Sequence, residues 1–221
     1  MSGGLRLYAI PYSTNVERVG LVLGHKGLAA EVVMCDPGDR SPIREASGQD
    51  LVPVLDDDGF CVADSTRIME HLERRFPDPP LYPADPARRA EVEVFVDWFN
   101  RVWKVPPNAI EAELAGGAPD HVRVAALEQE LRSTLDVFES LLAGRDYLLS
   151  DAISAADCAA FPFLKYGLWI KDGDDERFHR ILADNLALDG EHPRVEEWVR
   201  RMATHPRVDG IVVYDGGQGQ P

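Results

Sequence analysis

Residues 51–73, with the sequence LVPVLDDDGFCVADSTRIMEHLE, contain two short apolar runs that meet at Asp58-Gly59 and lead into an amphipathic segment. An Asp-Gly pair between two apolar runs is a strong signal for a β-hairpin. Apolar residues at helical spacing then predict a helix over 65–76, directly after the second strand. Pro53 has no N–H group for a sheet ladder, so we expect it at an edge or a bend, and the peptide bond before it is a candidate for the cis form.

The residues before this unit predict a strand, a helix and a second strand. LRLYAI (5–10) alternates in the manner of a strand, NVERVGLVLGHK (15–26) changes to helical spacing, and AEVVMC (30–35) is another apolar run. A helix between two closely spaced strands favours parallel pairing of those strands. A connector rich in proline and glycine (37–48) leads to the hairpin, so the first part of the chain reads β-α-β followed by β-β-α.

A proline-dense stretch, PDPPLYPADP (77–86), separates two parts of different character. Proline at this density continues neither a helix nor a sheet, so we interpret 79–86 as a linker between a first domain, 1–78, and a second domain, 87–221. Helical periodicity dominates the second domain, and Pro106-Pro107 is expected to end its first helix. The predicted helices cover about 87–104, 120–143, 154–170, 175–187 and 193–204.

Composition and charge restrict the class of partner. The chain has 221 residues and a formal net charge of −15, which argues against nucleic acid and anionic membranes because both require a basic surface. The sequence has neither a signal peptide nor an apolar run long enough to span a membrane, so we expect a cytoplasmic protein. Cys35, Cys61 and Cys158 lie in separate apolar runs and are expected to be reduced core residues. The histidines lack metal-binding spacing, so no metal is expected.

Three stretches resemble, in their order and spacing, the soluble (cytosolic-type) glutathione S-transferase family. They are YAIPYSTNVERVGLVLGHKGL (8–28), the hairpin segment 51–73 and GRDYLLSDAISAADCAAFPFL (144–164). The resemblance covers nearly the whole chain. It implies an α/β thioredoxin-like N-terminal domain (βαβ-ββα) that holds glutathione, followed by an all-α helical-bundle C-terminal domain that supplies most of the electrophile pocket. It also implies a homodimer.

The resemblance assigns Val52, Pro53, Asp64 and Ser65 to glutathione binding. Val52-Pro53 corresponds to the cis-proline step, whose first residue pairs its backbone with the cysteinyl part of the peptide. Asp64 and Ser65 correspond to the acidic residue and the serine that take the γ-glutamyl end. The chemistry agrees, because a helix start binds a carboxylate and Asp64 offers a counter-charge to an ammonium group. A plain helix cap is the alternative interpretation of this pair.

The thiol of glutathione must be ionised to react efficiently. A pKa near ~8.5 leaves only a few per cent as thiolate at neutral pH. Lowering that pKa by about two units requires roughly 2.7 kcal/mol of stabilisation. A hydrogen bond to the charged sulfur, at about 1.5 to 3 kcal/mol, together with a helix N-terminus, supplies this amount. Ser13, at the opening of the first helix, matches the thiolate-stabilising serine of serine-type transferases and is the catalytic candidate.

Alternatives to Ser13 lie within a few residues of it. Tyr8 is within about one residue of the position of the phenol in tyrosine-type members, and Tyr12 is another donor. Thr14 and Asn15 can share the donation to sulfur. A further alternative is that Ser13 or Asn15 only caps the helix, since both residue types are favoured caps. We expect Asn15 to be the cap and Ser13 to face the ligand.

The remaining site residues are expected at the two ends of the ligand. Asp50 stands where the family often has basic or amide groups around the glycine carboxylate, so Arg40 or Gln49 would serve there. The helix over 91–105 is expected to line the electrophile pocket, together with an aromatic residue from a later helix. The pocket residues are Trp98, Arg101, Trp103 and Tyr166. Ser154-Ala155-Ala156-Asp157 has the spacing of a capping box, to which we assign a structural role.

Together with the site residues, the resemblance implies a glutathione transferase of the detoxification type. Glutathione is its co-substrate, and its thiolate attacks a small hydrophobic electrophile. A glutathione-dependent isomerase or dehalogenase of the same fold is one alternative. A non-catalytic, transferase-like binding protein is the other.

Overall fold

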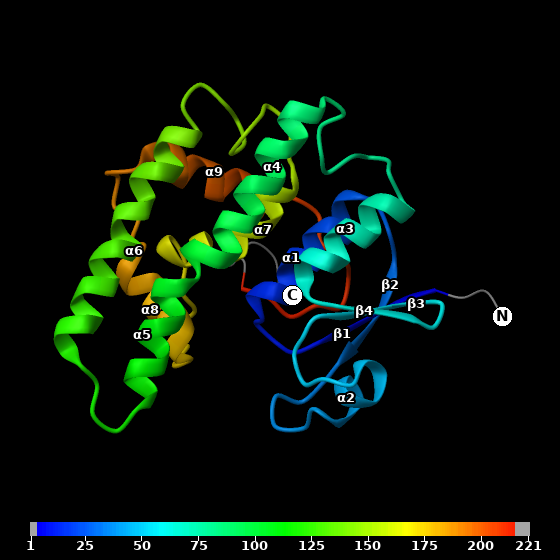
Figure 1. Cartoon of the computed structure of the whole chain (residues 1–221), viewed down its shortest axis with the longest axis horizontal. Helices are drawn as coiled ribbons and strands as arrows, with labels where there is room; N and C mark the ends of the chain where they lie inside the picture. The colour runs from blue at the N-terminus through cyan, green and yellow to red at the C-terminus, as the bar shows by residue number, and fades with distance from the viewer. Residues whose placement is uncertain (1–3, 215–221) are drawn as a thin grey trace. The chain divides into compact units, whose positions relative to one another are not determined.

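The computed structural model describes residues 4–214 of the chain, which divide into two compact units (Figure 1). The first unit contains the described residues up to 84 together with 204–213. The second contains 85–203 and Tyr214. Within residues 4–214, no helix is long and apolar enough to cross a membrane.

A four-stranded sheet with the order β2-β1-β3-β4 forms the centre of the first unit. β1 and β2 are parallel, with Leu7 opposite Val32, whereas β1 and β3 are antiparallel, with Leu7 opposite Leu55. The predicted hairpin joins β3 to β4. The strands are β1 (Leu5–Ala9), β2 (Ala30–Met34), β3 (Val54–Asp57) and β4 (Phe60–Ala63). This mixed sheet confirms the predicted βαβ-ββα order.

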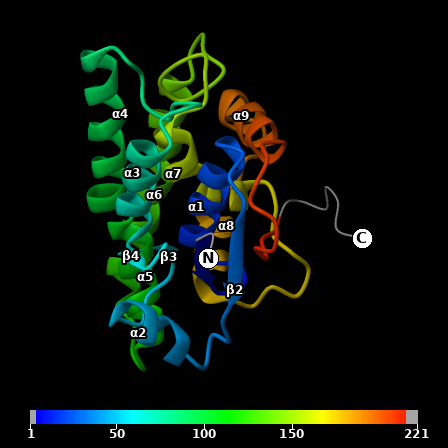
Figure 2. The ribbon, with the colours of Figure 1, turned by 90° about the vertical axis from the view of Figure 1, so that its right-hand side faces the viewer.

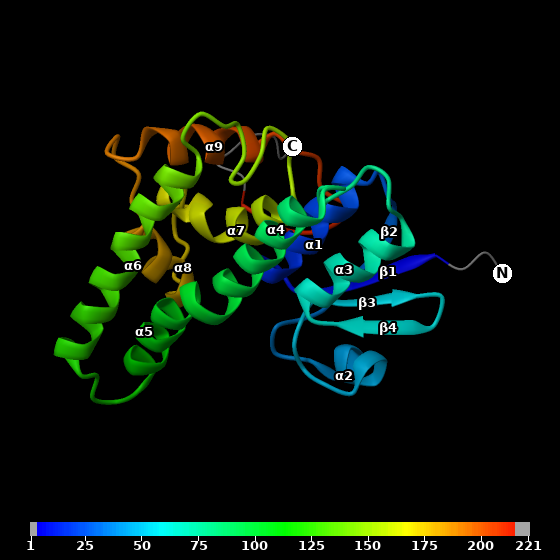
Figure 3. The same cartoon turned by 45° about the horizontal axis from the view of Figure 1, so that its top comes forward.

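Helices cover both faces of this sheet. α1 (Thr14–His25) and α3 (Ser65–Arg75) pack against each other on one face, and α2 (Ser41–Ser47) contacts β3 and β4 on the other (Figures 2 and 3). Alternation along β1 buries one set of side chains, including Leu7, and turns Arg6 and Tyr8 to the opposite side.

Two helices lie where the sequence predicted connectors. α2 occupies the proline- and glycine-rich stretch, and α5 (Val105–Ala115) follows at once where Pro106-Pro107 was expected to break the chain. In both helices proline stands in the first turn. Proline is favoured there because the first N–H groups of a helix have no partner within it. A proline that is expected to end one helix can therefore mark the start of the next helix.

The described residues of the second unit form helices and connecting loops, which confirms the predicted all-α domain. α4 ends in a π-helical turn, η1, whose aromatic residues enter the core. Phe99 stacks on Trp103 with ring centroids 4.3 Å apart, and Phe138 and Phe163 meet both rings edge-on. The elements not yet bounded are α4 (Pro86–Trp98), η1 (Phe99–Trp103), α6 (His121–Leu141), α7 (Ala155–Leu164), η2 (Lys165–Gly167), α8 (Arg177–Asn185) and α9 (Pro193–Ala203).

The chain between the two units is anchored to the first by a buried lysine. Lys26 Nζ donates to Glu73 Oε2 at 2.6 Å and to the carbonyl oxygens of Phe76 and Pro79 at 2.7 and 2.9 Å. Glu73 also accepts from the N–H of Leu81, whose side chain is buried. These contacts reach as far as Leu81, and the first compact unit runs to Ala84. The domain boundary at residue 78 stays a prediction.

The capping box of α7 is present as predicted. Ser154 Oγ accepts from the N–H of Ala156, and the carboxylate of Asp157 accepts from the N–H of Ser154 at 2.9 Å. Asp157 is fully buried and also accepts from the N–H of Leu148 and from Trp198 Nε1, each at 2.9 Å. The same aspartate therefore joins the start of α7 to α9.

None of the three cysteines forms a disulfide, and they do not share one environment. Cys35 and Cys158 are buried, as predicted, whereas Cys61 is exposed. Cys61 lies on β4, the edge strand of the sheet, where an apolar run does not guarantee burial. The prediction of a core position for Cys61 is therefore wrong.

Candidate functional site

Ser13 is the N-cap of α1. Its Oγ accepts from the N–H of Val16 at 3.3 Å, and its carbonyl oxygen accepts from the N–H of Glu17 at 3.0 Å. The extended backbone of Ser13 suits a cap, whereas Asn15 is already inside the helix. The prediction that Asn15 is the cap is therefore wrong. Ser13 and Asn15 are both favoured cap residue types, and the helix begins directly after Ser13.

Capping does not use up the hydrogen-bonding capacity of Ser13. A hydroxyl has two acceptor lone pairs and one O–H donor. The bond from Val16 occupies an acceptor position, which leaves the O–H able to donate to an anion. Ser13 is half-buried, and Thr14, the first residue of the helix, is buried behind it. The predicted donor and the cap are thus the same residue.

A second helix start carries the predicted acidic-serine pair. Asp64 is the N-cap of α3, and its Oδ1 accepts from the N–H groups of Thr66 and Arg67 at 2.9 and 3.2 Å. Ser65 is the first residue of the helix and is buried. Asp64 has φ of 78° and ψ of 126°, which a side chain with a Cβ rarely adopts. Backbone strain of this kind concentrates at functional sites.

The two helix starts meet through side chains. Ser65 Oγ donates to Asn15 Oδ1 at 3.5 Å and accepts from Arg18 Nη1 at 3.4 Å. Arg18 is fully buried, so its positive charge lies inside the first unit, next to the start of α3. The site therefore combines two helix N-termini with a guanidinium, and all three favour a negative charge.

Sequence reasoning did not identify Arg18 as a site residue. The available signal is its position between Val16 and Val19, on a helix whose neighbouring residues are buried. A charged residue among buried apolar positions needs a partner or a function, because burying a charge is costly.

The cis-proline step lies at the same end of the sheet as the start of α1. The Val52-Pro53 peptide bond is cis, as predicted. It precedes β3, and the pairing of β1 with β3 ends at Tyr8 and Val54, so the peptide group of Val52 lies outside this ladder. Val52 and Ile10 pack against the same small cluster of buried residues. The backbone of Val52 is thus placed beside the turn that leads into Ser13.

The two tyrosine alternatives have different surroundings. Tyr8 lies on the face of β1 opposite to Leu7 and packs, with Val52 and Ile10, against the small buried cluster. Arg6, on the same face, pairs across the sheet with Glu31 at 2.9 Å. Tyr12 immediately precedes Ser13 and has a left-handed backbone with φ of 58°. Of the two, Tyr12 is the one adjacent to the helix start.

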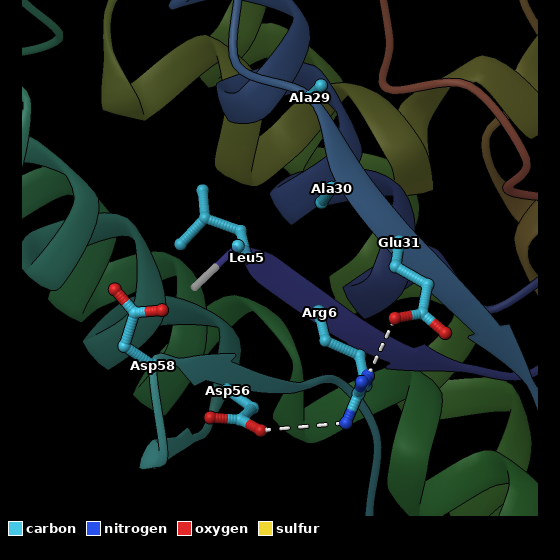
Figure 4. A pocket seen from close by; sticks show the side chains of 8 residues that line it. Leu5, Arg6, Ala29, Ala30, Glu31, Asp56 and Asp58 are labelled. Carbon is cyan, nitrogen blue, oxygen red and sulfur yellow. Dashed lines mark hydrogen bonds and ion pairs between the residues drawn. The ribbon is translucent and has the colours of Figure 1, made fainter. Parts of the chain in front are cut away.

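A pocket lies at the N-terminal end of β1, at the other end of the strand from Ser13 (Figure 4). Arg6 spans it and contacts Glu31 and Asp56, with N···O distances of 2.9 and 3.9 Å. The hydrogen bond and the charge of Glu31 raise the pKa of Arg6. Arg6, Glu31 and Asp56 of this pocket therefore pair with one another, and the pocket contains none of the predicted site residues.

The residues predicted for the glycine carboxylate have local contacts. Arg40 precedes α2, and its Nε donates to the carbonyl oxygen of Pro37 at 2.9 Å. The amide of Gln49 donates to the carbonyl oxygen of Leu51 and accepts from the N–H of Leu51, both at 2.7 Å. Gln49 therefore shapes the turn that leads to the cis proline.

Two of the four residues predicted for the electrophile pocket belong to the core of the second unit. Trp103 is 1% exposed and donates from Nε1 to Thr134 Oγ1 at 3.0 Å. Tyr166 is 3% exposed and stacks on His179 with centroids 4.5 Å apart. The structure contradicts a pocket-lining role for both, because helical spacing of aromatic residues does not distinguish a core face from a pocket face.

The other two predicted pocket residues reach the surface. Trp98 is half-buried, with its ring centroid 5.6 Å from that of Phe95. Arg101 is exposed and pairs with Asp97 at 2.6 Å on the same helical face. Within residues 4–214, no group of three or more His, Cys, Asp or Glu side chains is placed to hold a metal ion.

A thioredoxin-like unit with a cis proline beside two helix starts, followed by a helical unit, defines the class of protein. Two family models match this chain. The model described as glutathione S-transferase, N-terminal domain, matches residues 7–80, and the model described as glutathione S-transferase, C-terminal domain, matches residues 121–201. The chain belongs to the glutathione S-transferase family.

Relatives of the chain have names of two kinds. It is 32% identical over 168 residues to glutathione S-transferase 3 of Zea mays, and the aligned region covers 69% of this chain and 73% of that protein. It is 30% identical over 148 residues to a stringent starvation protein A homolog of Pasteurella multocida, with 66% and 67% covered. It is 29% identical over 179 residues to FtsZ-localized protein A of Caulobacter vibrioides, with 72% and 75% covered.

Solved structures show the same fold. A glutathione S-transferase from Rhodospirillum rubrum F11 superposes with a TM-score of 0.70 at 26% identity, covering 91% of this chain and 89% of that one. The Tau class glutathione S-transferase MiGSTU from mango gives a TM-score of 0.75 at 19% identity, covering 93% and 90%.

Proposed function

We propose that this protein is a glutathione transferase in which Ser13 stabilises the thiolate of bound glutathione. The observation that carries this proposal is the junction of the α1 and α3 N-termini through Ser65, Asn15 and Arg18. Of the three negative groups of glutathione in the reacting state, we assign two to this junction, the thiolate and the α-carboxylate of the γ-glutamyl end. Two adjacent helix starts provide N–H groups and positive partial charge for both.

Each part of the ligand has a partner of matching chemistry. The Ser13 hydroxyl donates to the sulfur, with Thr14 and Asn15 as neighbouring donors. The backbone of Val52 pairs with the cysteinyl part, before Pro53. Ser65 and the N–H groups of α3 take the α-carboxylate. The Asp64 carboxylate takes the α-ammonium. Its Oδ1 accepts both cap hydrogen bonds, from Thr66 and Arg67, so that Oδ2 can accept from the ligand. Arg40 is assigned to the glycine carboxylate, with Gln49 shaping the turn beside it.

The same geometry favours Ser13 over Tyr8 as the donor to sulfur. Tyr8 lies within β1 and is not itself part of a helix start. Ser13 has its hydroxyl at the start of α1, where the helix adds to the stabilisation of an anion. Tyr12 is the remaining alternative.

The reaction follows from an ionised thiol. The thiol proton passes to solvent as Ser13 donates to the sulfur anion. The sulfur then attacks an electron-poor carbon, a carbon–sulfur bond forms and the leaving group departs with its electron pair. Trp98 and Arg101 are assigned to the electrophile, which we infer to be small and hydrophobic. The proposal includes a cytoplasmic location, which is expected from the sequence, and a homodimer, which the family resemblance implies.

Retention on immobilised glutathione, followed by turnover of an activated aryl halide, tests the proposal. Binding with turnover supports a transferase. A second candidate is a non-catalytic interaction protein, which is favoured by relatives named for stringent starvation and for localisation with FtsZ. Loss of both retention and turnover would favour that candidate. A same-fold isomerase or dehalogenase would leave glutathione unconsumed, which mass spectrometry of the thiol pool after turnover detects.

Replacing Asp64 by asparagine separates its ligand role from its cap role. Asparagine is as good an N-cap as aspartate and tolerates a positive φ, so the free energy of unfolding should change by less than about 0.5 kcal/mol. Loss of the charge should raise the KM for glutathione by roughly tenfold, which corresponds to about 1.4 kcal/mol, with little change in kcat. Steady-state kinetics and urea unfolding measure the two effects.

Asp85→Asn is the matched control for this variant. Asp85 is the N-cap of α4, and its Oδ1 accepts from the N–H of Arg88 at 2.9 Å. It has the same local role as Asp64 without a place at the proposed site. An equal change in KM in the two variants would contradict the assignment of Asp64 to the α-ammonium group.

A further inference from the structure

Residues 204–213 follow α9 and pack within the first unit, along α1. We call this segment the C-terminal strap. The N–H of Val208 donates to the carbonyl oxygen of Gly20 at 3.0 Å. Further along, the carbonyl oxygen of Val212 accepts from the N–H of Tyr12 at 2.7 Å. The strap therefore runs beside the helix and reaches the turn immediately before Ser13.

Two glycines of α1 allow this close approach. A Cβ atom built on Gly24 would overlap the carbonyl group of Pro206, which is backbone and has little freedom to move. A Cβ on Gly20 would overlap the Cδ1 of Ile211. Glycine in a helix interior costs about 1 kcal/mol relative to alanine, so its presence at both positions needs a packing reason. The strap provides that reason.

A buried ion pair fixes the strap to α1. Glu17 Oε1 accepts from Arg207 Nε at 3.1 Å and lies 3.0 Å from Arg207 Nη2. The side chain of Glu17 is 1% exposed and that of Arg207 is 12% exposed. A carboxylate this deeply buried depends on its partner, because an uncompensated buried charge is strongly unfavourable.

The strap ends on a strained residue. Tyr12 has φ of 58°, a left-handed conformation that is uncommon for residues other than glycine, asparagine and aspartate. Such a conformation persists when the surrounding structure holds it. The bond from the Tyr12 N–H to Val212 supplies such a hold, one residue before the Ser13 hydroxyl.

We propose that the C-terminal strap positions Ser13, with Arg207 and Glu17 as a positioning pair. The pair anchors the strap, the strap holds Tyr12 in its left-handed conformation, and this conformation sets the direction of the Ser13 hydroxyl toward the thiolate. Arg207 also neutralises Glu17, which lies one helical turn from Ser13 on the same side of α1. This proposal rests on the proposed thiolate-stabilising role of Ser13.

The charged groups that bear on the bound thiol come from three elements. Glu17 and Arg18 belong to α1, Arg207 to the strap and Asp64 to the start of α3. Removal of Arg207 leaves Glu17 as an uncompensated negative charge on the side of Ser13. Both this charge and a misdirected hydroxyl disfavour the thiolate, so the apparent pKa of the bound thiol should rise.

Arg207→Gln tests the proposal with two readouts. The first is the amide hydrogen exchange of Tyr12, which should accelerate by at least tenfold while amides of the β1–β2 ladder keep their protection. The second is the pH profile of kcat/KM, whose rising limb should move to higher pH by about one unit, a tenfold loss at neutral pH that disappears above the new pKa. A merely structural loss of folded protein would lower the rate by the same factor at every pH.

Arg200→Gln is the matched control, because Arg200 also pairs with a glutamate, Glu196, but within α9 and at an exposed position. Gly24→Ala is a second variant, which displaces the strap at Pro206 while favouring the helix. It should reproduce both effects, and Arg207→Lys should restore part of the activity. Unchanged Tyr12 exchange in Arg207→Gln and Gly24→Ala, or a limb that does not move, would overturn the proposal. If the wild-type protein neither binds glutathione nor turns over, the proposed function fails, and Tyr12 exchange still decides whether the strap holds the turn.

Discussion

Replacing Ser13 by alanine is expected to lower kcat at neutral pH by roughly ten- to a thousandfold, the scale of losing one donor to an anion in an enzyme site. The Ser13 hydroxyl lies at the start of α1 and keeps its O–H for the sulfur while accepting from the N–H of Val16. Without that O–H, the thiolate loses a charge-assisted hydrogen bond and the thiol pKa rises. The pH dependence of kcat with an activated aryl halide measures both changes.

A control is needed because Ser13 is also the cap of α1. Ser13→Ala should cost about 1 kcal/mol of stability, since alanine caps a helix poorly. Ser13→Asp keeps a favoured cap but has no donor and adds a negative charge, so stability should be retained while activity falls at least as far. Ser13→Thr keeps both cap and donor and should recover activity. An unchanged rate in Ser13→Ala would contradict the assignment and move it to Tyr12 or Tyr8.

Local chemistry predicts the part of the fold around the hairpin. Asp58 and Gly59 have φ of 55° and 89°, so both central residues of the turn are left-handed, as the Asp-Gly pair predicts. The cis bond at Pro53 and the helix start at Ser65 follow from the same stretch. Each of these features depends on residues within a few positions, where one residue type has a strong conformational preference.

Side-chain environment is harder to predict from the same residues. Trp98 and Trp103 lie on one helical segment with similar neighbours in sequence, yet Trp103 is enclosed by other aromatic rings and Trp98 is half-buried. Which face of a helix meets the core depends on packing against other helices. The sequence pattern defines the apolar face but does not say what covers it.

Long-range contacts explain the remaining differences. The Glu17–Arg207 pair joins residues that are 190 positions apart, and neither residue type indicates the other. The only local signal is the pair of glycines at positions 20 and 24 of α1, which indicates that another segment approaches the helix closely. That signal does not identify the segment, so the path of residues 204–213 required the structure.

Replacing Asp157 by alanine is expected to lower the free energy of unfolding by about 3 to 5 kcal/mol, as when one partner of a buried charged network is removed. The Asp157 carboxylate is fully buried and accepts from the N–H groups of Leu148 and Ser154, from Ser154 Oγ and from Trp198 Nε1, each at 2.9 Å. Burial raises the pKa of Asp157, and these donors act in the opposite direction. Alanine would leave the donors without their acceptor in a dry environment, where an unpaired polar group is costly. Urea unfolding followed by circular dichroism measures the change.

Asp120→Ala is the matched control for Asp157→Ala. Asp120 is the N-cap of α6, where its Oδ1 accepts from the N–H groups of Val122 and Arg123 at 3.0 and 3.1 Å. It is exposed, so water can replace its bonds, and its loss should cost only about 1 kcal/mol. The difference between the two variants isolates the contribution of burial and of the contact with Trp198. Equal costs would show that Asp157 acts only as a helix cap, and a recovery in Asp157→Asn of more than half the loss would show that its Oδ1 contacts dominate over its charge.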